Sequence, residues 1–223
     1  MGSVAENIAR VRGGLPAGVG LTAVSKFHPV EKLMEAYEAG QRVFGESRVQ
    51  ELLMKVAAMP DDVEWHFIGH LQTNKVRQLV GKVSMIESVD SVRLLGLIDA
   101  ESVRAGVVSR VLMQVHVARE ETKFGFDCDE LLDFFRSGGH RELAATRICG
   151  VMGMASNTDD AERVSADFGR IAEVFSSVRS LCGDELPDFT ELSMGMSHDY
   201  PEAVRRGSTM VRVGSAIFGD REY

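Results

Sequence analysis

The sequence has little cysteine and no long apolar run. Its three cysteines, Cys128, Cys149 and Cys182, lie far apart, and their odd number and the lack of any C-x-x-C pair argue against a disulfide framework. No stretch approaches the roughly 20 apolar residues that a membrane-spanning helix needs. Residues 1–20 also lack the apolar run of a signal peptide. We therefore expect a soluble protein of the reducing cytoplasm.

Basic residues are outnumbered by acidic ones. Lys and Arg total 25 and Asp and Glu total 33, which gives a net charge of −8. Because an acidic surface repels the phosphates of nucleic acids and anionic lipids, we expect neither nucleic acid nor membrane as a partner. An anionic ligand would have to be bound by local groups rather than by the overall field.

Turn signals of β-hairpins are nearly absent. Short apolar runs alternate instead with longer amphipathic segments, which is typical of parallel strands joined by helices. The pattern predicts strands at residues 20–25, 42–44, 65–68, 83–87, 107–117, 148–154, 192–196 and 210–218. It predicts helices at residues 4–11, 30–39, 46–59, 74–80, 91–105, 131–136, 159–181 and 200–206.

This α/β alternation favours a closed (β/α)8 TIM barrel formed as a single domain by residues 1–223, with an extra N-terminal helix. An open doubly wound sheet has the same alternation and stays an alternative. No helix is predicted after the last strand, and we expect the N-terminal helix to cover that gap. In a barrel, the functional residues lie at the carboxyl ends of the strands.

The residues at the ends of the first two predicted strands can be interpreted as functional or as purely structural. Lys26 is either a solvated strand-end residue or an amine held against apolar walls, where it would attack a carbonyl carbon. Gly45 suits a tight turn, and we expect Glu46 in the first turn of the next helix, where the helix dipole favours a carboxylate.

The third strand is followed by a segment rich in polar residues. Thr73 is expected to act as a helix N-cap. His66 and His70 are spaced like metal ligands, but no third ligand is in evidence, so we expect no metal site.

Small residues follow the last two strands. Ser193 and the pair Gly214–Ser215 leave backbone N–H groups open, and TIM barrels often bind phosphate after strands seven and eight. A pair of tight turns is the alternative. Arg212 has an apolar residue on each side, so it is expected to point into the barrel mouth, where it needs an acceptor. Ser197 and Asp199 are expected to cap the next helix.

Five blocks of the sequence resemble, in order, the pyridoxal phosphate homeostasis proteins, formerly called proline synthase co-transcribed homologues. The blocks are residues 23–26, 44–51, 66–75, 192–197 and 211–219. The resemblance implies the fold of the alanine racemase N-terminal domain, with pyridoxal 5′-phosphate (PLP) at the barrel mouth.

The resemblance also implies roles for individual residues. Lys26 would hold PLP as a Schiff base, the internal aldimine, and Arg212 would hydrogen-bond the pyridine nitrogen. Phosphate contacts are implied for Ser193, Gly214 and Ser215, and further cofactor contacts for Asn74 and Met154. Lys123 matches a recurrent family position, and a role in cofactor loading or release is a hypothesis.

The implied site argues against an enzyme. Arginine at the pyridine nitrogen discourages ring protonation and makes the ring a weaker electron sink, which disfavours transamination. A racemase needs acid–base groups on both faces of its substrate. The racemase family takes the second group from a separate β-domain, and because this sequence ends at Tyr223 we expect no such domain and no catalytic residue.

We therefore expect a protein of PLP homeostasis that buffers and transfers the cofactor. Its partners would be PLP itself and, transiently, PLP-dependent apoenzymes, and it would be a monomer or weak dimer. Two alternatives remain open: a minimal amino-acid racemase or lyase with the same cofactor, and a barrel that binds another phosphorylated ligand.

Overall fold

The computed structural model describes residues 2–118 and 124–219. Within them, eight parallel strands pair in chain order, and β8 pairs with β1, so the sheet is a closed barrel and not an open doubly wound sheet. The strands are β1 (Gly20–Val24), β2 (Val43–Glu46), β3 (Glu64–Phe67), β4 (Met85–Val89), β5 (Ser109–His116), β6 (Thr146–Met154), β7 (Glu191–Ser193) and β8 (Met210–Val213). The predicted barrel is confirmed.

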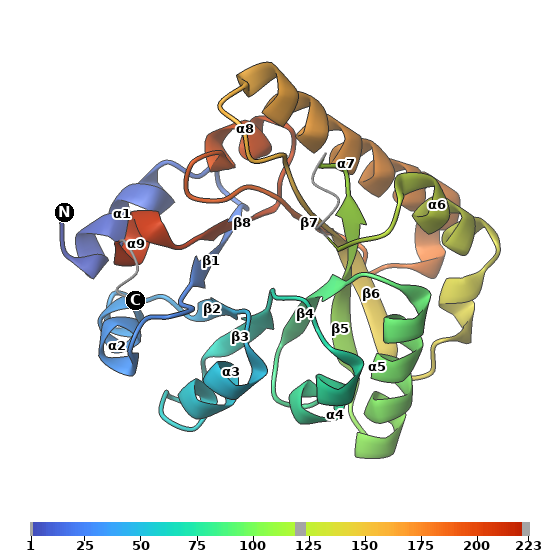
Figure 1. Ribbon diagram of the computed structural model, residues 1–223, viewed down its shortest axis with the longest axis horizontal. Helices are drawn as coiled ribbons and strands as arrows, with labels where there is room; N and C mark the ends of the chain where they lie inside the picture. The colour runs from blue at the N-terminus through green and yellow to red at the C-terminus, as the bar shows by residue number, and fades with distance from the viewer. Residues whose placement is uncertain (1, 119–123, 220–223) are drawn as a thin grey trace.

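Helices surround the ring of strands on its outside (Figure 1). They are α1 (Val4–Gly13), α2 (Val30–Glu38), α3 (Val49–Val56), α4 (Val76–Leu79), α5 (Val92–Ala105), α6 (Cys128–Arg136), α7 (Ala161–Cys182), α8 (Tyr200–Arg205) and α9 (Ser215–Phe218). Short 3-10 turns are η1 (Thr73–Lys75), η2 (Gly139–Glu142) and η3 (Gly183–Glu185). Among the described residues, no helix is both long and apolar enough to cross a membrane.

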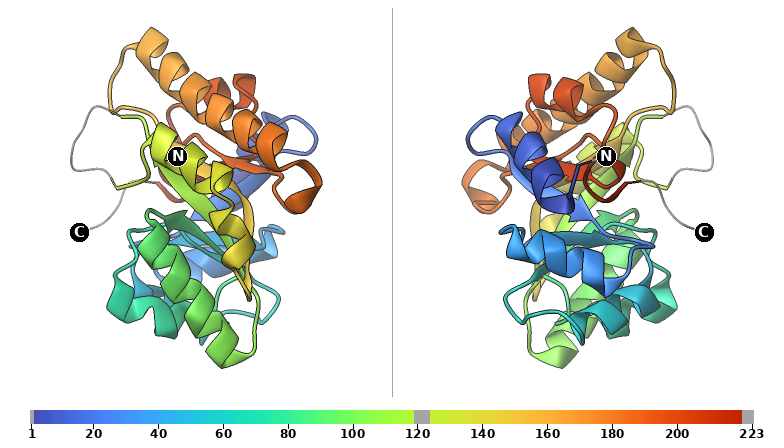
Figure 2. Two further views of the ribbon diagram at one scale, coloured as in Figure 1. Left: turned by 90° about the vertical axis from the view of Figure 1, so that its right-hand side faces the viewer. Right: turned by 90° about the vertical axis from the view of Figure 1, so that its left-hand side faces the viewer.

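The C-terminal part of the barrel differs from the prediction. The strand predicted over residues 210–218 ends at Val213, and one helical turn, α9, follows it. The turn forms because the carbonyl of Gly214 accepts hydrogen bonds from the N–H groups of Ile217 and Phe218. The extra N-terminal helix α1 lies beside α9 (Figures 1 and 2), and Asn7 Nδ2 donates to the carbonyl of Ile217 over 2.9 Å.

Two expectations near β2 and β3 were wrong. Glu46 is the last residue of β2, not the first turn of a helix, because β2 stays paired with β3 up to Glu46↔Phe67. The helix begins only at Val49. Thr73 lies inside a 3-10 turn and caps nothing, since Gln72 occupies the cap position and no side chain bonds there.

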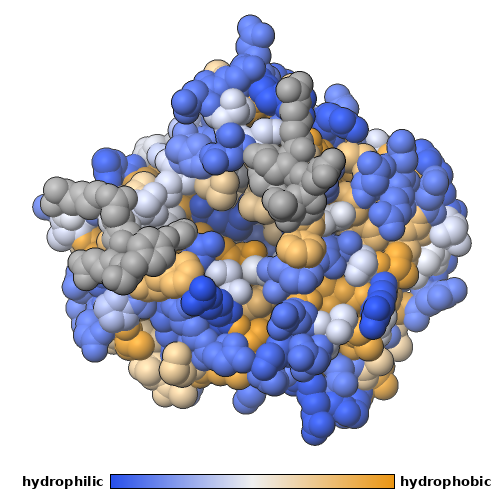
Figure 3. All heavy atoms as spheres, in the orientation of Figure 1, coloured by the Kyte–Doolittle hydropathy of each residue, from blue (hydrophilic) through white to orange (hydrophobic). Residues whose placement is uncertain are grey.

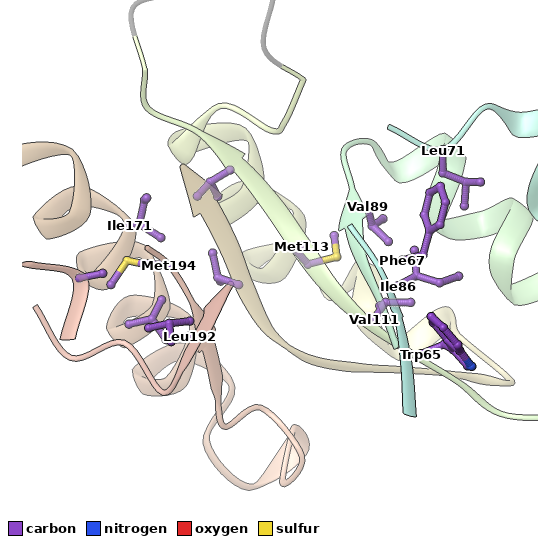
Figure 4. Packing of buried hydrophobic residues seen from close by; sticks show 14 of the residues in the cluster. Trp65, Phe67, Leu71, Ile86, Val89, Val111, Met113, Ile171, Leu192 and Met194 are labelled. Carbon is purple, nitrogen blue, oxygen red and sulfur yellow. The ribbon is translucent and has the colours of Figure 1, made fainter. Parts of the chain in front are cut away.

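The main core lies between the barrel wall and the helices. Trp65, Phe67 and Ile86 come from neighbouring strands and gather there, all 4% exposed or less (Figure 4). A second, smaller cluster consists of Met85, Leu112, Cys149 and Met152, and these side chains come from β4, β5 and β6. Met152 is 1% exposed and is packed inside the barrel.

A bulge between β5 and β6 depends on glycine. The register shifts between Val111 and Leu112, and Gly150 on the other strand has φ 155°. A Cβ at Gly150 would lie 1.7 Å from the carbonyl oxygen of Glu191, so no other residue fits. This close approach lies where the middle of β6 pairs with Glu191, the first residue of β7.

Candidate functional site

A cavity of about 520 Å³ lies at the carboxyl ends of the strands, within the size range of small-molecule sites. It is lined by Val24, Lys26, Ile68, Met152, Met154, Met196, Ser197, His198, Arg212, Gly214 and Ser215. In the space-filling view, apolar residues (orange) are exposed near the middle of this face among hydrophilic ones (blue) (Figure 3). The structure thus brings together five residues predicted from the sequence: Lys26, Met154, Arg212, Gly214 and Ser215.

Lys26 follows β1 after one residue, Ser25, and occupies the second position of a turn. The carbonyl of Ser25 accepts a hydrogen bond from the N–H of His28 at 3.1 Å, which closes the turn. The third position, Phe27, has φ 68°, a left-handed conformation that non-glycine residues adopt at a cost of about 1–3 kcal/mol. The turn directs a half-buried Lys26 into the cavity.

Behind this turn, on the side of α3, lies a buried ionic cluster that the sequence did not reveal. Lys55 Nζ lies 2.7 Å from Glu46 Oε1 and 2.7 Å from Glu51 Oε1. Burial raises the pKa of Glu46, and the charge of Lys55 opposes that shift. An apolar strand that ends in the carboxylate of Glu46 could have indicated this cluster. The partner of Glu46, Lys55, lies nine residues further along the chain.

Arg212 comes from β8 and is 4% exposed. Nη1 donates to the carbonyl and hydroxyl oxygens of Ser193 at 2.8 and 2.6 Å, and Nη2 donates to the carbonyl of Gly153 at 3.0 Å. Burial lowers the pKa of Arg212, while Glu87 and Asp199 oppose the shift. These bonds use three of the five guanidinium hydrogens, so donors remain for a ligand in the cavity.

Glu87 is the buried acidic partner of this arginine. Its Oε2 accepts a hydrogen bond from the Ser193 hydroxyl at 2.6 Å and lies 3.8 Å from Arg212 Nη1, and its Oε1 lies 2.7 Å from His66 Nδ1. Burial alone would raise the pKa of Glu87, but the hydrogen bond from His66 and the charges of His66 and Arg212 hold it below its usual value. The carboxylate thus fixes Ser193 and Arg212. A glutamate in the apolar run 85–89 was the available signal.

The two histidines considered as metal ligands belong to different pairs. His66 is held by Glu87, whereas His70 Nδ1 lies 2.9 Å from Asp90 Oδ2 near the surface. Over residues 2–118 and 124–219, no group of three or more His, Cys, Asp or Glu side chains is arranged to hold a metal ion.

The structure places the two serines near β7 differently from the expectation. Ser193 is fully buried, its hydroxyl is used by Glu87 and Arg212, and it does not line the cavity. Ser197 lines the cavity, and its Oγ accepts hydrogen bonds from the N–H groups of Gly214 at 3.1 Å and Ala216 at 3.4 Å. Ser197 therefore does not cap α8. Asp199 occupies the cap position, but its side chain bonds no helix N–H, and its Oδ1 accepts from the N–H of Met196 instead.

Two further predicted residues lie elsewhere. Asn74 is exposed in the turn η1 and does not line the cavity. Lys123 lies outside the described residues. His198, which the sequence did not single out, does line the cavity and is exposed.

The family model of the alanine racemase N-terminal domain matches residues 1–222. The pyridoxal phosphate homeostasis protein of Aquifex aeolicus is 40% identical over 204 residues, which cover 91% of this chain and 87% of that protein.

Solved structures are also similar to this chain. PipY of Synechococcus elongatus PCC7942, solved with PLP bound, is 37% identical with a TM-score of 0.88, and the match covers 97% of this chain and 100% of PipY. The alanine racemase of Bartonella henselae, with covalently bound pyridoxal phosphate, has a TM-score of 0.74 at 17% identity, covering 98% of this chain and 59% of that one. The racemase likeness shows a shared fold alone.

Proposed function

This chain belongs to the pyridoxal phosphate homeostasis protein family, built on the alanine racemase N-terminal domain, and on that premise we propose that it binds PLP in the barrel mouth through Lys26. The observation that carries the proposal is one cavity lined by an amine, a buried guanidinium with donors to spare, and a serine at two backbone amides. These groups match the aldehyde, the pyridine nitrogen and the phosphate of PLP.

The residues present fit this cofactor in a definite orientation. Arg212 would face the pyridine nitrogen, and Gly214, Ser215 and Ser197 would hold the phosphate. Ile68 and the methionines Met152, Met154 and Met196 offer apolar walls to a flat ring. We assign Ser193 to holding Arg212 in place, rather than to the phosphate contact expected from the sequence.

Bound PLP supplies a reactive aldehyde and an electron-withdrawing pyridine ring. Lys26 would supply the amine that joins the aldehyde carbon while the aldehyde oxygen leaves as water, so no oxidant or reductant would be needed. Arg212 keeps its positive charge at the ring nitrogen and thereby disfavours protonation there, which limits the use of the ring as an electron sink.

We infer a role in storing and transferring PLP rather than in turning over a substrate. The relatives bear the name of homeostasis proteins, and PipY was solved with PLP bound. Among the described residues that line the cavity, the groups able to carry charge are Lys26, His198 and Arg212. Transient contact with PLP-dependent apoenzymes, a monomeric or weakly dimeric state and a cytoplasmic location are parts of the same proposal.

A transfer assay tests this function. The PLP-loaded protein is mixed with an apoenzyme in the presence of a phosphatase that destroys free PLP, and recovery of the apoenzyme's activity is followed. The proposal predicts recovery from the loaded protein under conditions in which the same amount of free PLP gives none. Equal loss of recovery from both sources would contradict transfer, although binding would stand.

A further inference from the structure

The two peptide groups on either side of the Lys26 Cα are both held by the helix α3. Lys55 Nζ donates to the carbonyl of Ser25 at 2.9 Å, which belongs to the peptide before Lys26. Glu51 Oε1 accepts from the N–H of Phe27 at 2.6 Å, which belongs to the peptide after Lys26. Glu51 and Lys55 are themselves paired, four residues apart on one helix face, at 2.7 Å. Two side chains from one turn of α3 therefore hold the peptide groups on both sides of Lys26 by hydrogen bonds.

The cluster that supplies these bonds is well anchored. The side chain of Lys55 is 5% exposed and that of Glu46 is fully buried, and their 2.7 Å pair connects α3 to the end of β2. The hydroxyl of Ser25 also donates to Glu46 Oε1 at 2.6 Å. Displacing one partner of a buried ion pair leaves the other charge buried and unpaired, which strongly destabilises the folded protein. The cluster therefore resists movement. Through these hydrogen bonds the cluster restricts movement of the backbone at residues 25–27.

The backbone next to Lys26 needs such support. A left-handed φ of 68° at Phe27 persists only where surrounding contacts over-determine it. Glu51 supplies a contact to the amide of that residue, and the Arg48 guanidinium lies 4.6 Å from the centre of its ring. If Phe27 relaxed to a negative φ, the peptide plane between residues 26 and 27 would turn. The direction of the Lys26 side chain would then no longer be fixed.

From these contacts we propose that Glu51 and Lys55 are positioning residues for Lys26: they fix the turn so that its amine meets the PLP aldehyde. The proposal rests on the proposed function. Glu51 and Lys55 lie behind the barrel wall and do not line the cavity, so neither touches the cofactor. Their effect is confined to the covalent link, whereas the proposed contacts to the pyridine nitrogen and the phosphate come from β8 and from the segments that follow β7 and β8.

Two ligands separate this effect from general damage to the site. PLP can form the covalent link, whereas pyridoxine 5′-phosphate carries an alcohol in place of the aldehyde and can use only the ring and phosphate contacts. Glu51→Ala removes the acceptor for the Phe27 amide and leaves the Lys55–Glu46 pair intact, so the variant is expected to fold. We expect its affinity for PLP to fall about 10-fold, the size of one lost hydrogen bond, with the analogue's affinity within about 2-fold of the parent.

Two more variants sharpen the test. Glu51→Gln keeps an oxygen that accepts from the Phe27 amide, and it should restore PLP affinity to within about 3-fold of the parent. Lys55→Met removes the hydrogen bond to the Ser25 carbonyl and should lower the affinity for PLP at least as much as Glu51→Ala does. The rate of appearance of the Schiff-base absorbance should fall in Glu51→Ala and recover in Glu51→Gln.

Asp167→Ala is the matched control. Like Glu51, Asp167 is a helical carboxylate in an i,i+4 pair, here with Arg163, and its Oδ2 accepts from a loop amide, that of Ser156, at 2.8 Å. This control should lose stability without a selective loss of PLP. Unchanged PLP affinity in Glu51→Ala, or equal loss of PLP and analogue, would overturn the positioning role. A parent protein with no borohydride-reducible link at all would instead contradict the proposed function and this inference with it.

Discussion

Arg212 on β8 and Glu87 on β4 face each other across the interior of the barrel, with Nη1 3.8 Å from Oε2, and the Ser193 hydroxyl bridges them. The arginine is therefore held by a fixed, buried counter-charge before any ligand arrives. Its orientation toward the cavity needs no rearrangement on binding, which lowers the entropic cost of holding a ligand.

Removing that counter-charge should be costly. Glu87→Ala leaves Arg212 buried with its charge unbalanced, so we expect the free energy of unfolding to fall by about 3–5 kcal/mol. Denaturant unfolding followed by circular dichroism measures the change. Asp133→Ala removes a carboxylate that pairs with Arg136 on the surface, and it should have little effect. Equal small effects of the two substitutions would show that the buried pair does not hold the site.

The same carboxylate predicts a pH dependence. Because the pKa of Glu87 is lower in the folded protein than its ordinary value of 4.5, its contribution to stability is complete above that value. The contribution is lost as the pH falls from 4.5 through the lower folded pKa. Glu87→Gln should therefore make the acid-side decline of the unfolding free energy shallower. An identical decline in parent and variant would contradict the direction of the shift.

The phosphate contacts can be separated from those of Arg212. Ser197→Ala removes the hydroxyl at the amides of Gly214 and Ala216, so we expect affinity for PLP to fall about 10-fold while affinity for pyridoxal, which lacks the phosphate, changes little. Ser193→Ala loosens Arg212 and should weaken both ligands alike. Isothermal titration of the four combinations gives the comparison, and a phosphate-selective loss in Ser193→Ala would reverse the assignment of the two serines.

Racemase activity is expected to be absent or very slow. With Arg212 at the ring nitrogen, as proposed above, the ring would give little help to a carbanion, so incorporation of solvent deuterium at Cα of L-alanine should stay well below about 1 per second, the lower end of typical enzyme rates. Proton NMR in deuterium oxide measures the exchange, with a genuine alanine racemase as the reference. Exchange at the reference rate would favour the enzyme alternative.

The order of strands and helices was predictable from the sequence, because apolar residues are spaced differently in strands and in amphipathic helices. Lys26 and Arg212 were predictable as cavity residues, since one ends an apolar run and the other interrupts one. In each case the decisive information lay within a few neighbouring residues.

The supporting contacts were not predictable, because they join distant parts of the chain. Glu46 looked like a helix-start carboxylate until its pairing with Lys55 was known. The role of Ser193 in holding Arg212 depends on Glu87, which lies 106 residues before Ser193. The positive φ of Phe27 has no local signal, since glycine is the residue that usually marks it.

The central claim is that Lys26 holds PLP covalently. Reduction of the PLP-loaded protein with borohydride, followed by peptide mapping, tests it most directly. We predict one phosphopyridoxyl group, on Lys26, and its loss in Lys26→Ala while pyridoxine 5′-phosphate still binds. A label on another lysine such as Lys55, or no label at all, would contradict the account.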